Sequence, residues 1–217
     1  MYEHLDKLLE AEKKKIRTAF NRLSVTGFDE LNVVNTRKTT QALFEKLLAD
    51  NERLFLLAAK NAYKKAIKTA RAKDFDGEES DASGELVAAV LGGYNFITGY
   101  LYNKETERKR LRLNEQILTA REYNSRAMLQ TSLRRTANLW WTQTVQYGVS
   151  MVDESTIKGF KDMGVEWVQW VTAADEKTCP TCRMRDNRVY RLNKVPPKPH
   201  YGCRCYIVPI KAEEVET

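Results

Sequence analysis

Five residues with soft, metal-ligating side chains lie close together late in the sequence. The segment from Thr178 to Cys205 holds all four cysteines of the chain and one of its two histidines. The spacing is C-x2-C, then seventeen residues, then H-x2-C-x-C. Proteins hold structural zinc with four thiolate or imidazole ligands in a tetrahedron, and a C-x2-C turn brings two sulfur atoms to one centre. The pattern therefore predicts a Zn²⁺ site.

This segment supplies five candidates for four coordination positions. The candidate ligands are Cys179, Cys182, His200, Cys203 and Cys205. Residues two apart in an extended strand point to the same side, so Cys203 and Cys205 could both face the metal. His200 follows a proline-rich turn and is either a ligand or a hydrogen-bonding partner of one. We expect four of these five residues to bind zinc, and the sequence leaves open which.

Other chemistries are open to such a cysteine pattern. A redox C-x-x-C would need the strand–CxxC–helix context of a βαβ fold, which the flanking residues do not indicate. Two disulfides would need an oxidising compartment, but the opening MYEHLDKLLEAEKKK lacks the apolar stretch of a secretory signal. A zinc deaminase would need H-x-E, and neither histidine is followed two residues later by glutamate. We therefore expect a closed, structural zinc site and no enzyme activity.

Composition bounds the classes of protein that could carry such a site. The 217 residues are 42% hydrophobic and 30% charged, typical of a globular or helical protein, and no apolar run is long enough to span a membrane. The net charge of +7 permits contact with nucleic acid. The arginines between positions 108 and 135 fall on several helix faces, which favours solvated positions and salt bridges over a dedicated DNA groove.

The elements that precede the cysteines are predicted to be helices. Apolar residues recur at helical spacing over 2–23 and 39–73. Residues 73–85 are acidic and glycine-bearing and predict a mobile linker, and the following apolar stretch, 85–103, suits a buried helix. Residues 104–148 hold no proline, and no glycine before Gly148, which predicts one long helix or two collinear ones.

The sequence pattern changes near residue 153, from long helical periodicity to shorter segments. A short helix is expected to end at Gly164, and the alternating stretch 165–172 predicts a strand with Val168 and Trp170 on one face. YRL and CRCYIVPI predict two further strands. The expected fold is mainly α: an elongated helical body over 1–152, followed by a small α+β zinc-binding module over 153–217.

The cysteine segment resembles the C-terminal signature of the phage head morphogenesis family, the minor head proteins similar to the phage Mu F protein. The resemblance covers roughly residues 157–209, about a quarter of the chain. It differs at Asp186-Asn187, where the family often has glycine after the aspartate, and at Tyr201-Gly202, where Pro-Asn often follows the histidine. Asparagine tolerates the left-handed turn that a glycine would serve. The matching residues are Trp170, Thr172, Asp175, Thr178, Cys179, Cys182, His200, Cys203, Arg204 and Cys205.

What the resemblance implies is a structural virion protein, made in the host cytoplasm. Such proteins associate with the portal protein and with the major capsid or scaffold protein inside the head, several copies around the portal, and some contact double-stranded DNA. No membrane partner is expected. Two other functions stay open at this point: a nucleic-acid-binding zinc protein that acts without the portal, and a zinc-dependent nuclease or other hydrolase with His200 as its base.

Overall fold

The computed structural model describes residues 2–25, 32–79, 100–172, 178–199 and 203–215. The described chain is mainly helical, at 74% helix, with a small C-terminal three-stranded sheet. It divides into two compact units. The helical unit comprises Lys7–Phe55 and Leu91–Val145, and the sheet unit comprises Met1–Asp6, Leu56–Val90 and Gln146–Thr217. The predicted fold class, mainly α with a small α+β module, is confirmed.

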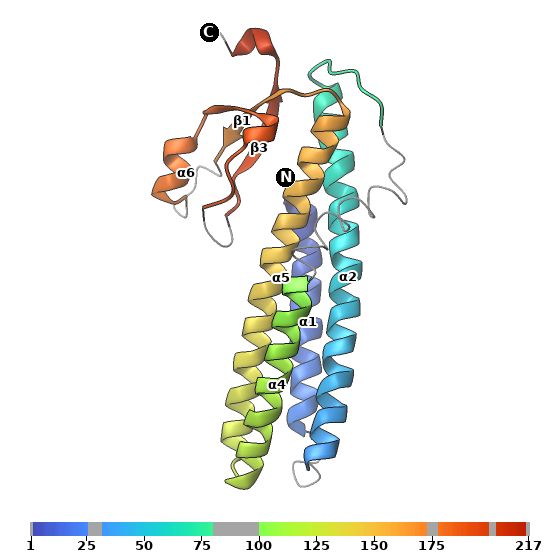
Figure 1. Cartoon of the computed structure of the whole chain (residues 1–217), viewed down its shortest axis with the longest axis vertical. Coiled ribbons are helices and arrows are strands. Elements are labelled where there is room, and N and C mark those ends of the chain that lie inside the picture. The colour runs from blue at the N-terminus through green and yellow to red at the C-terminus, as the bar shows by residue number, and fades with distance from the viewer. Residues whose placement is uncertain (1, 26–31, 80–99, 173–177, 200–202, 216–217) are drawn as a thin grey trace. The chain divides into compact units, whose positions relative to one another are not determined.

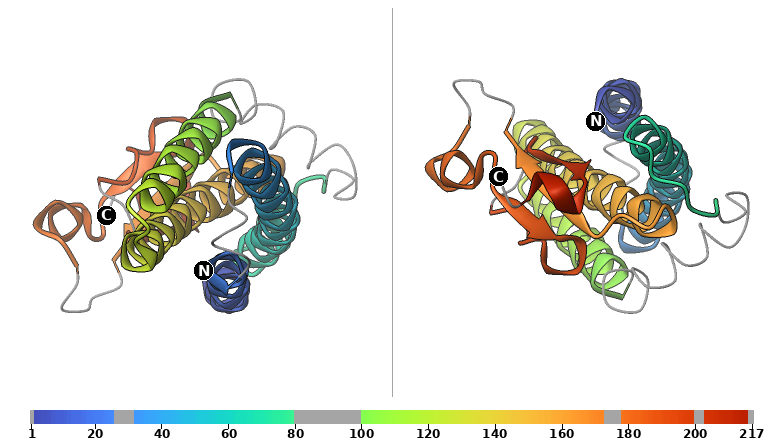
Figure 2. Two further views of the ribbon diagram at one scale, coloured as in Figure 1. Left: turned by 90° about the horizontal axis from the view of Figure 1, so that it is seen from below. Right: turned by 90° about the horizontal axis from the view of Figure 1, so that it is seen from above.

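The helical unit is built from segments of α1 (Glu3–Val25), α2 (Val33–Arg71), α4 (Tyr100–Glu122) and α5 (Arg126–Asp162). Within it these helices run side by side (Figures 1 and 2). Phe44 lies between Phe20 and Trp140 and meets both rings edge to face, with centroids 6.4 and 5.4 Å away. The buried core consists of Ile16, Phe20, Leu23, Leu43, Phe44, Leu47, Leu113, Ile117, Ala120, Leu129, Leu133, Ala137 and Trp140.

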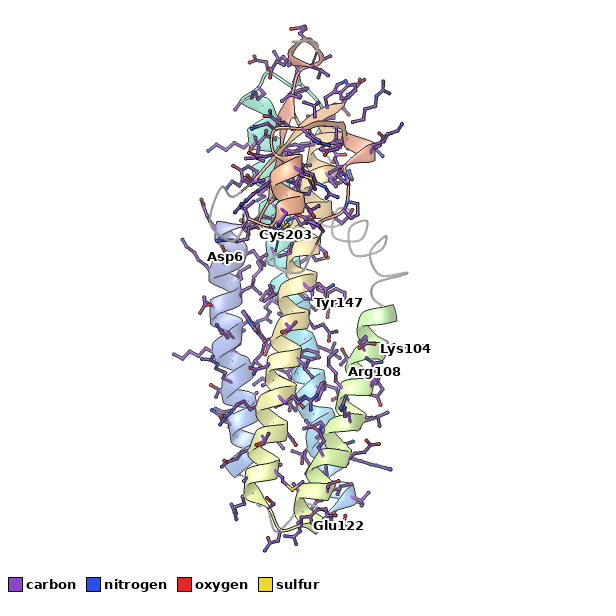
Figure 3. The ribbon with its side chains drawn as sticks, turned by 90° about the vertical axis from the view of Figure 1, so that its left-hand side faces the viewer. Asp6, Lys104, Arg108, Glu122, Tyr147 and Cys203 are labelled. Carbon is purple, nitrogen blue, oxygen red and sulfur yellow. The ribbon has the colours of Figure 1, made fainter. Side chains whose placement is uncertain are left out.

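The chain reverses direction between α4 and α5, so the predicted single helix or collinear pair over 104–148 is wrong. Figure 3 shows Glu122 where α4 ends and the chain turns back into α5. Asn124 adopts a left-handed φ of 47°, and the N–H of Ser125 donates to the carbonyl of Ala120 at 2.8 Å. The Ser125 hydroxyl then accepts from the N–H of Met128 and caps α5. An Asn-Ser pair thus ends one helix and begins the next without glycine or proline.

In the sheet unit, the upper parts of α2 and α5 pack closely. Gly159 on α5 permits this approach, because a Cβ atom there would lie 2.8 Å from the Cβ of Ala66. The hydroxyl of Tyr63 donates to Asp162 at 2.8 Å. Gly164 ends the helix in a left-handed conformation, φ 71°, as the sequence predicted. The helix that it ends is the 37-residue α5, so the separate short helix expected before Gly164 is wrong.

The sheet has the order β2-β1-β3 and is antiparallel throughout, with β1 (Trp167–Val171) in the centre. Its neighbours are β2 (Val189–Arg191) and β3 (Tyr206–Ile210). Val168 pairs with Tyr190 on one side and Pro209 on the other, and it is fully buried together with Trp170, the face that the alternation predicted. Pro209 is tolerated because β3 is an edge strand of this sheet.

The remaining elements are short. α6 (Pro180–Arg185) follows β1, and two 3-10 turns, η3 (Leu192–Lys194) and η4 (Ala212–Glu214), flank β3 along the chain. The predicted helix over 85–103 lies largely outside the described residues. Of the predicted linker 73–85, only residues 73–79 are described, and Gly77 lies against the backbone of Asp162 and Met163. The boundary predicted between 152 and 153 stays a prediction; α5 continues through it.

Candidate metal centre

The first two cysteines are positioned by the start of α6. Cys179 is the N-cap residue, in extended conformation, and its sulfur accepts a hydrogen bond from the N–H of Cys182 at 3.3 Å. Pro180 occupies the first helical position, where its missing N–H and fixed φ cost nothing. The sequence thus folds C-P-T-C into a single helical turn. It leaves Cys179 partly exposed and Cys182 fully buried.

The other two cysteines are positioned by the extended chain that enters β3. The strand begins at Tyr206 rather than at Cys203, where it was predicted to begin. Residues 203–205 nevertheless alternate between buried and exposed, as they would in a strand. Cys203 and Cys205 are buried, at 2% and 3% exposure, while Arg204 between them is exposed. Both thiols therefore lie on the inner side of the segment.

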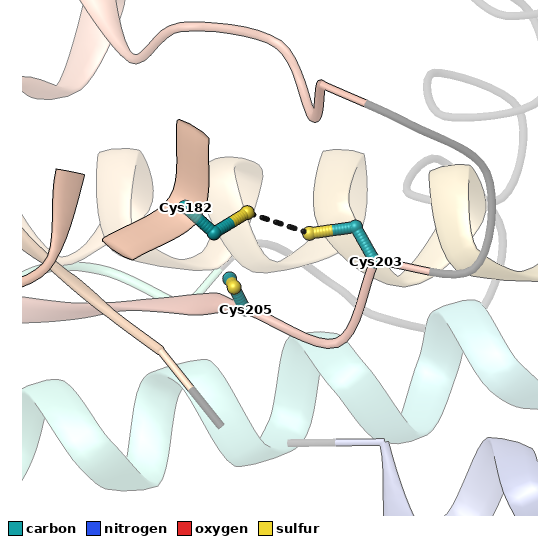
Figure 4. Close-up of side chains that lie close together, drawn as sticks. All are labelled: Cys182, Cys203 and Cys205. Carbon is teal, nitrogen blue, oxygen red and sulfur yellow. Dashed lines mark hydrogen bonds between the residues drawn. The ribbon is translucent and has the colours of Figure 1, made fainter. Parts of the chain in front are cut away.

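The thiols of Cys182, Cys203 and Cys205 lie close together (Figure 4). The sulfur atoms of Cys182, Cys203 and Cys205 all lie within 4.8 Å of one another, and those of Cys182 and Cys203 are 3.5 Å apart. Four sulfurs at 2.3 Å from a tetrahedral zinc would be about 3.8 Å apart. None of the four cysteines forms a disulfide. This buried cluster is therefore able to hold a metal ion, with Cys179 on the adjoining turn.

Burial among neighbouring thiols raises the pKa values of Cys182 and Cys203. Burial raises the pKa of the Cys182 thiol strongly, and contacts with the thiols of Cys205, Cys203 and Cys179 raise it further. Burial likewise raises the pKa of Cys203. Without a cation Cys182 and Cys203 are therefore held as thiols, because burial disfavours the charged thiolate. Metal binding here must release protons.

Several residues named from the sequence lie outside the described chain. His200 is one of them, as are Asp175, Tyr201 and Gly202. Of the five candidate ligands, the structure brings together Cys182, Cys203 and Cys205, and it places Cys179 beside Cys182. Asn187 has a φ of 60°, the left-handed conformation that asparagine tolerates better than most residues.

Sequence reasoning missed three residues that form a polar cluster beside Cys203 and Cys205: Tyr2, Asp153 and Lys198. Burial lowers the pKa of the Lys198 ammonium to about 8. Burial raises the pKa of the Asp153 carboxyl, and the charge of Glu154 raises it further. The ammonium of Lys198 lies 3.0 Å from this carboxylate. No local pattern could reveal this group, because its members are up to 196 positions apart.

A cavity of about 550 Å³ borders the cluster. Asp153 and Lys198 contribute charged groups to its wall, and Trp170 and Pro196 contribute apolar surface. Cys205 also lines the cavity, so the cysteine cluster borders a mixed polar and apolar space.

No helix within the described part of the chain has the length and apolar character that crossing a membrane requires. No protein-family model, curated protein or solved structure matches this sequence.

Proposed function

We propose that the protein is a phage minor head protein, a structural virion component that associates with the portal and the capsid interior during head assembly. The observation that carries the proposal is the convergence of the signature cysteines. Cys182, Cys203 and Cys205 form one buried cluster at the junction of α6 and the segment entering β3. That is the arrangement expected if the cysteines of the head morphogenesis signature serve to close a small C-terminal module.

We propose that the cluster binds Zn²⁺ through Cys179, Cys182, Cys203 and Cys205. The donor set supports zinc over harder cations, because thiolate ligands select soft or borderline metals. Among the described residues, the cluster contains no carboxylate or imidazole. Four sulfurs complete a tetrahedron and leave no open position for substrate, so the role proposed for the metal is structural. His200 is then left outside the coordination shell.

The basic residues of α4 give no support to a dedicated DNA groove. Arg108 and Lys109 pair with Glu105 at 2.9 and 3.5 Å, and Arg110 pairs with Glu107 on the same helix. Arg108 lies on α4 in Figure 3. These positive charges are partly neutralised by acidic neighbours three or four residues away on the same helix.

The test is assembly with the portal protein of the phage that encodes this chain. Wild-type protein and a Cys182→Ser/Cys203→Ser double variant are each co-expressed with portal and major capsid protein, and head particles and portal rings are purified by sedimentation. We expect the wild type to co-sediment with portal rings or heads. The double variant should be depleted from them if the module is needed for docking.

Failure of the wild-type protein to bind portal or capsid under assembly conditions would overturn the proposal. Binding to double-stranded DNA that weakens steeply with salt, without portal association, would instead favour a nucleic-acid-binding zinc protein.

A further inference from the structure

Three polar side chains from distant parts of the sheet unit form one cluster. The ammonium of Lys198 lies 3.0 Å from a carboxylate oxygen of Asp153 and donates to the hydroxyl of Tyr2. Tyr2 also donates to Asp153, and its ring centroid is 4.1 Å from the Lys198 nitrogen. Tyr2 precedes α1, Asp153 belongs to α5, and Lys198 lies between η3 and the C-x-C segment. The cluster therefore joins three separate segments.

This cluster contacts the backbone of the cysteines themselves. Lys198 donates to the carbonyl oxygen of Cys203, and the hydroxyl of Tyr2 donates to the carbonyl oxygen of Cys205, each at 3.3 Å. A phenol hydroxyl has a single proton, so Tyr2 shares one donor between the carboxylate of Asp153 and the carbonyl oxygen of Cys205. The three donor positions of Lys198 are fully used by Asp153, Tyr2 and Cys203.

These contacts fix the segment on both sides of Arg204. The carbonyls of Cys203 and Cys205 are held by groups that are themselves buried, with Tyr2 at 7% exposure and the Lys198 side chain at 16%. Holding both carbonyls fixes the rotation of the extended chain about its axis, which decides where the two thiols point. Four thiolates around one Zn²⁺ carry a net charge of −2, and a buried ammonium beside them offsets part of that charge.

We propose that Tyr2, Asp153 and Lys198 are positioning residues of the metal centre. They hold the backbone of Cys203 and Cys205 so that both thiols face Cys182, and Lys198 supplies a compensating positive charge. The inference rests on the proposed zinc site and adds to it three residues that are not ligands. Outer partners of this kind are worth about 10- to 100-fold in metal affinity in other metal sites.

The test measures the affinity of the full chain for Zn²⁺ and for Co²⁺, with a chromophoric chelator competing for the metal. Lys198→Met removes the ammonium but keeps most of the aliphatic length, and Tyr2→Phe removes only the hydroxyl. Lys198→Arg restores a positive charge with donors. Lys194→Met is the matched control, because Lys194 is an exposed lysine four residues earlier on the same segment.

We expect Lys198→Met to weaken binding about 10- to 100-fold. Tyr2→Phe should weaken it by less, Lys198→Arg should recover part of the loss, and Lys194→Met should bind like the wild type. The Co²⁺ spectrum, whose thiolate-to-metal bands report ligand geometry, should shift in Lys198→Met and stay unchanged in Lys194→Met. A purely stabilising role would leave the spectrum of the folded protein unaltered.

The proposal is overturned if Lys198→Met and Tyr2→Phe hold both metals as tightly as the wild type with the same Co²⁺ spectrum. If the wild type binds metal in that experiment, the zinc site is still supported and only the positioning role is contradicted. A wild-type chain that binds neither metal overturns the zinc site and the positioning role together. Association with the portal is measured in the separate co-sedimentation experiment. A failure of the proposed head function is therefore distinguishable from a failure of the zinc site or of the positioning role.

Discussion

The carboxylate of Asp186 accepts two hydrogen bonds from Thr172, one from its backbone N–H and one from its hydroxyl, each at 2.9 Å. Thr172 directly follows β1, and Asp186 directly follows α6. The N–H of the next residue, Asn187, donates to the carbonyl of Trp170 at 2.8 Å. This pair of residues ties the helical turn that carries Cys182 to the central strand of the sheet.

Asp186→Ala should therefore loosen the connection between α6 and β1. We expect a loss of about 1–2 kcal/mol, because two partly buried donors lose their acceptor. Asp186→Asn is the control, since its amide oxygen can still accept both bonds. Hydrogen exchange of the β1 amides, followed by mass spectrometry, measures the effect. Equal protection in the alanine variant and the wild type would show that the pair contributes nothing.

The proposed ligand set makes a prediction about His200. If the four cysteines complete the site, His200→Ala should retain one Zn²⁺ per chain and an unchanged Co²⁺ spectrum. Cys203→Ser should lose tight binding, and chelation of the metal should lower the melting temperature of the sheet unit in the wild type. Metal analysis and melting curves decide the matter. Loss of metal in His200→Ala, with retention in Cys179→Ser, would exchange these two residues as ligands.

Much of the sheet unit follows from local patterns, and the rest does not. The alternation around Val168 and Trp170 predicts β1 and its buried face, and the cysteine spacing predicts a set of candidate ligands without deciding which of them meet. Neither pattern contains Tyr2 or Asp153, because their contacts depend on tertiary packing between segments far apart in the chain. The reversal at Asn124 was missed for a different reason: asparagine does the work of glycine there, and a rule based on glycine and proline cannot detect it.

The turn at Asn124 gives a direct test of that reading. Asn124 is exposed and has a φ of 47°. The size of its side chain therefore has little effect on stability, and the effect of a substitution depends on how well the new residue adopts a left-handed backbone. Asn124→Gly should be neutral within a few tenths of a kcal/mol. Asn124→Val should destabilise the helical unit by about 1–2 kcal/mol, the cost of a left-handed residue with a branched Cβ. Urea unfolding compares the two; equal stabilities would contradict the assigned turn.

Gly159 allows a prediction in which two effects oppose each other. Alanine is favoured over glycine in a helix by about 1 kcal/mol. A Cβ at this position, however, would lie 2.8 Å from the Cβ of Ala66 and 3.1 Å from the carbonyl oxygen of Tyr63, and such overpacking costs about 1–3 kcal/mol. We expect Gly159→Ala to lower the melting temperature, whereas Lys161→Ala, at an exposed position on the same helix, should leave it nearly unchanged. A Gly159→Ala variant more stable than the wild type would show that α2 can move away.

Glu12 makes stability depend on pH in the helical unit. Its side chain is 2% exposed, one carboxylate oxygen has no hydrogen-bond partner among the described residues, and Lys15 contacts the other at 3.2 Å. Burial raises the pKa of Glu12 above its ordinary 4.5, and the contact with Lys15 opposes this only in part. The folded state therefore binds the proton more tightly than the unfolded chain does.

It follows that the stability contributed by protonated Glu12 is fully present below pH 4.5 and is lost as the pH rises from there through the raised pKa of the folded state. Glu12→Gln has no such proton to lose. We expect the two proteins to be similarly stable in acid and the glutamine variant to become the more stable one as neutral pH is approached. Glu10→Gln, on the same helix but 74% exposed, should follow the wild type. Urea unfolding across this pH range measures the difference, and a constant difference at every pH would mean that Glu12 titrates in the fold as it does in the unfolded chain.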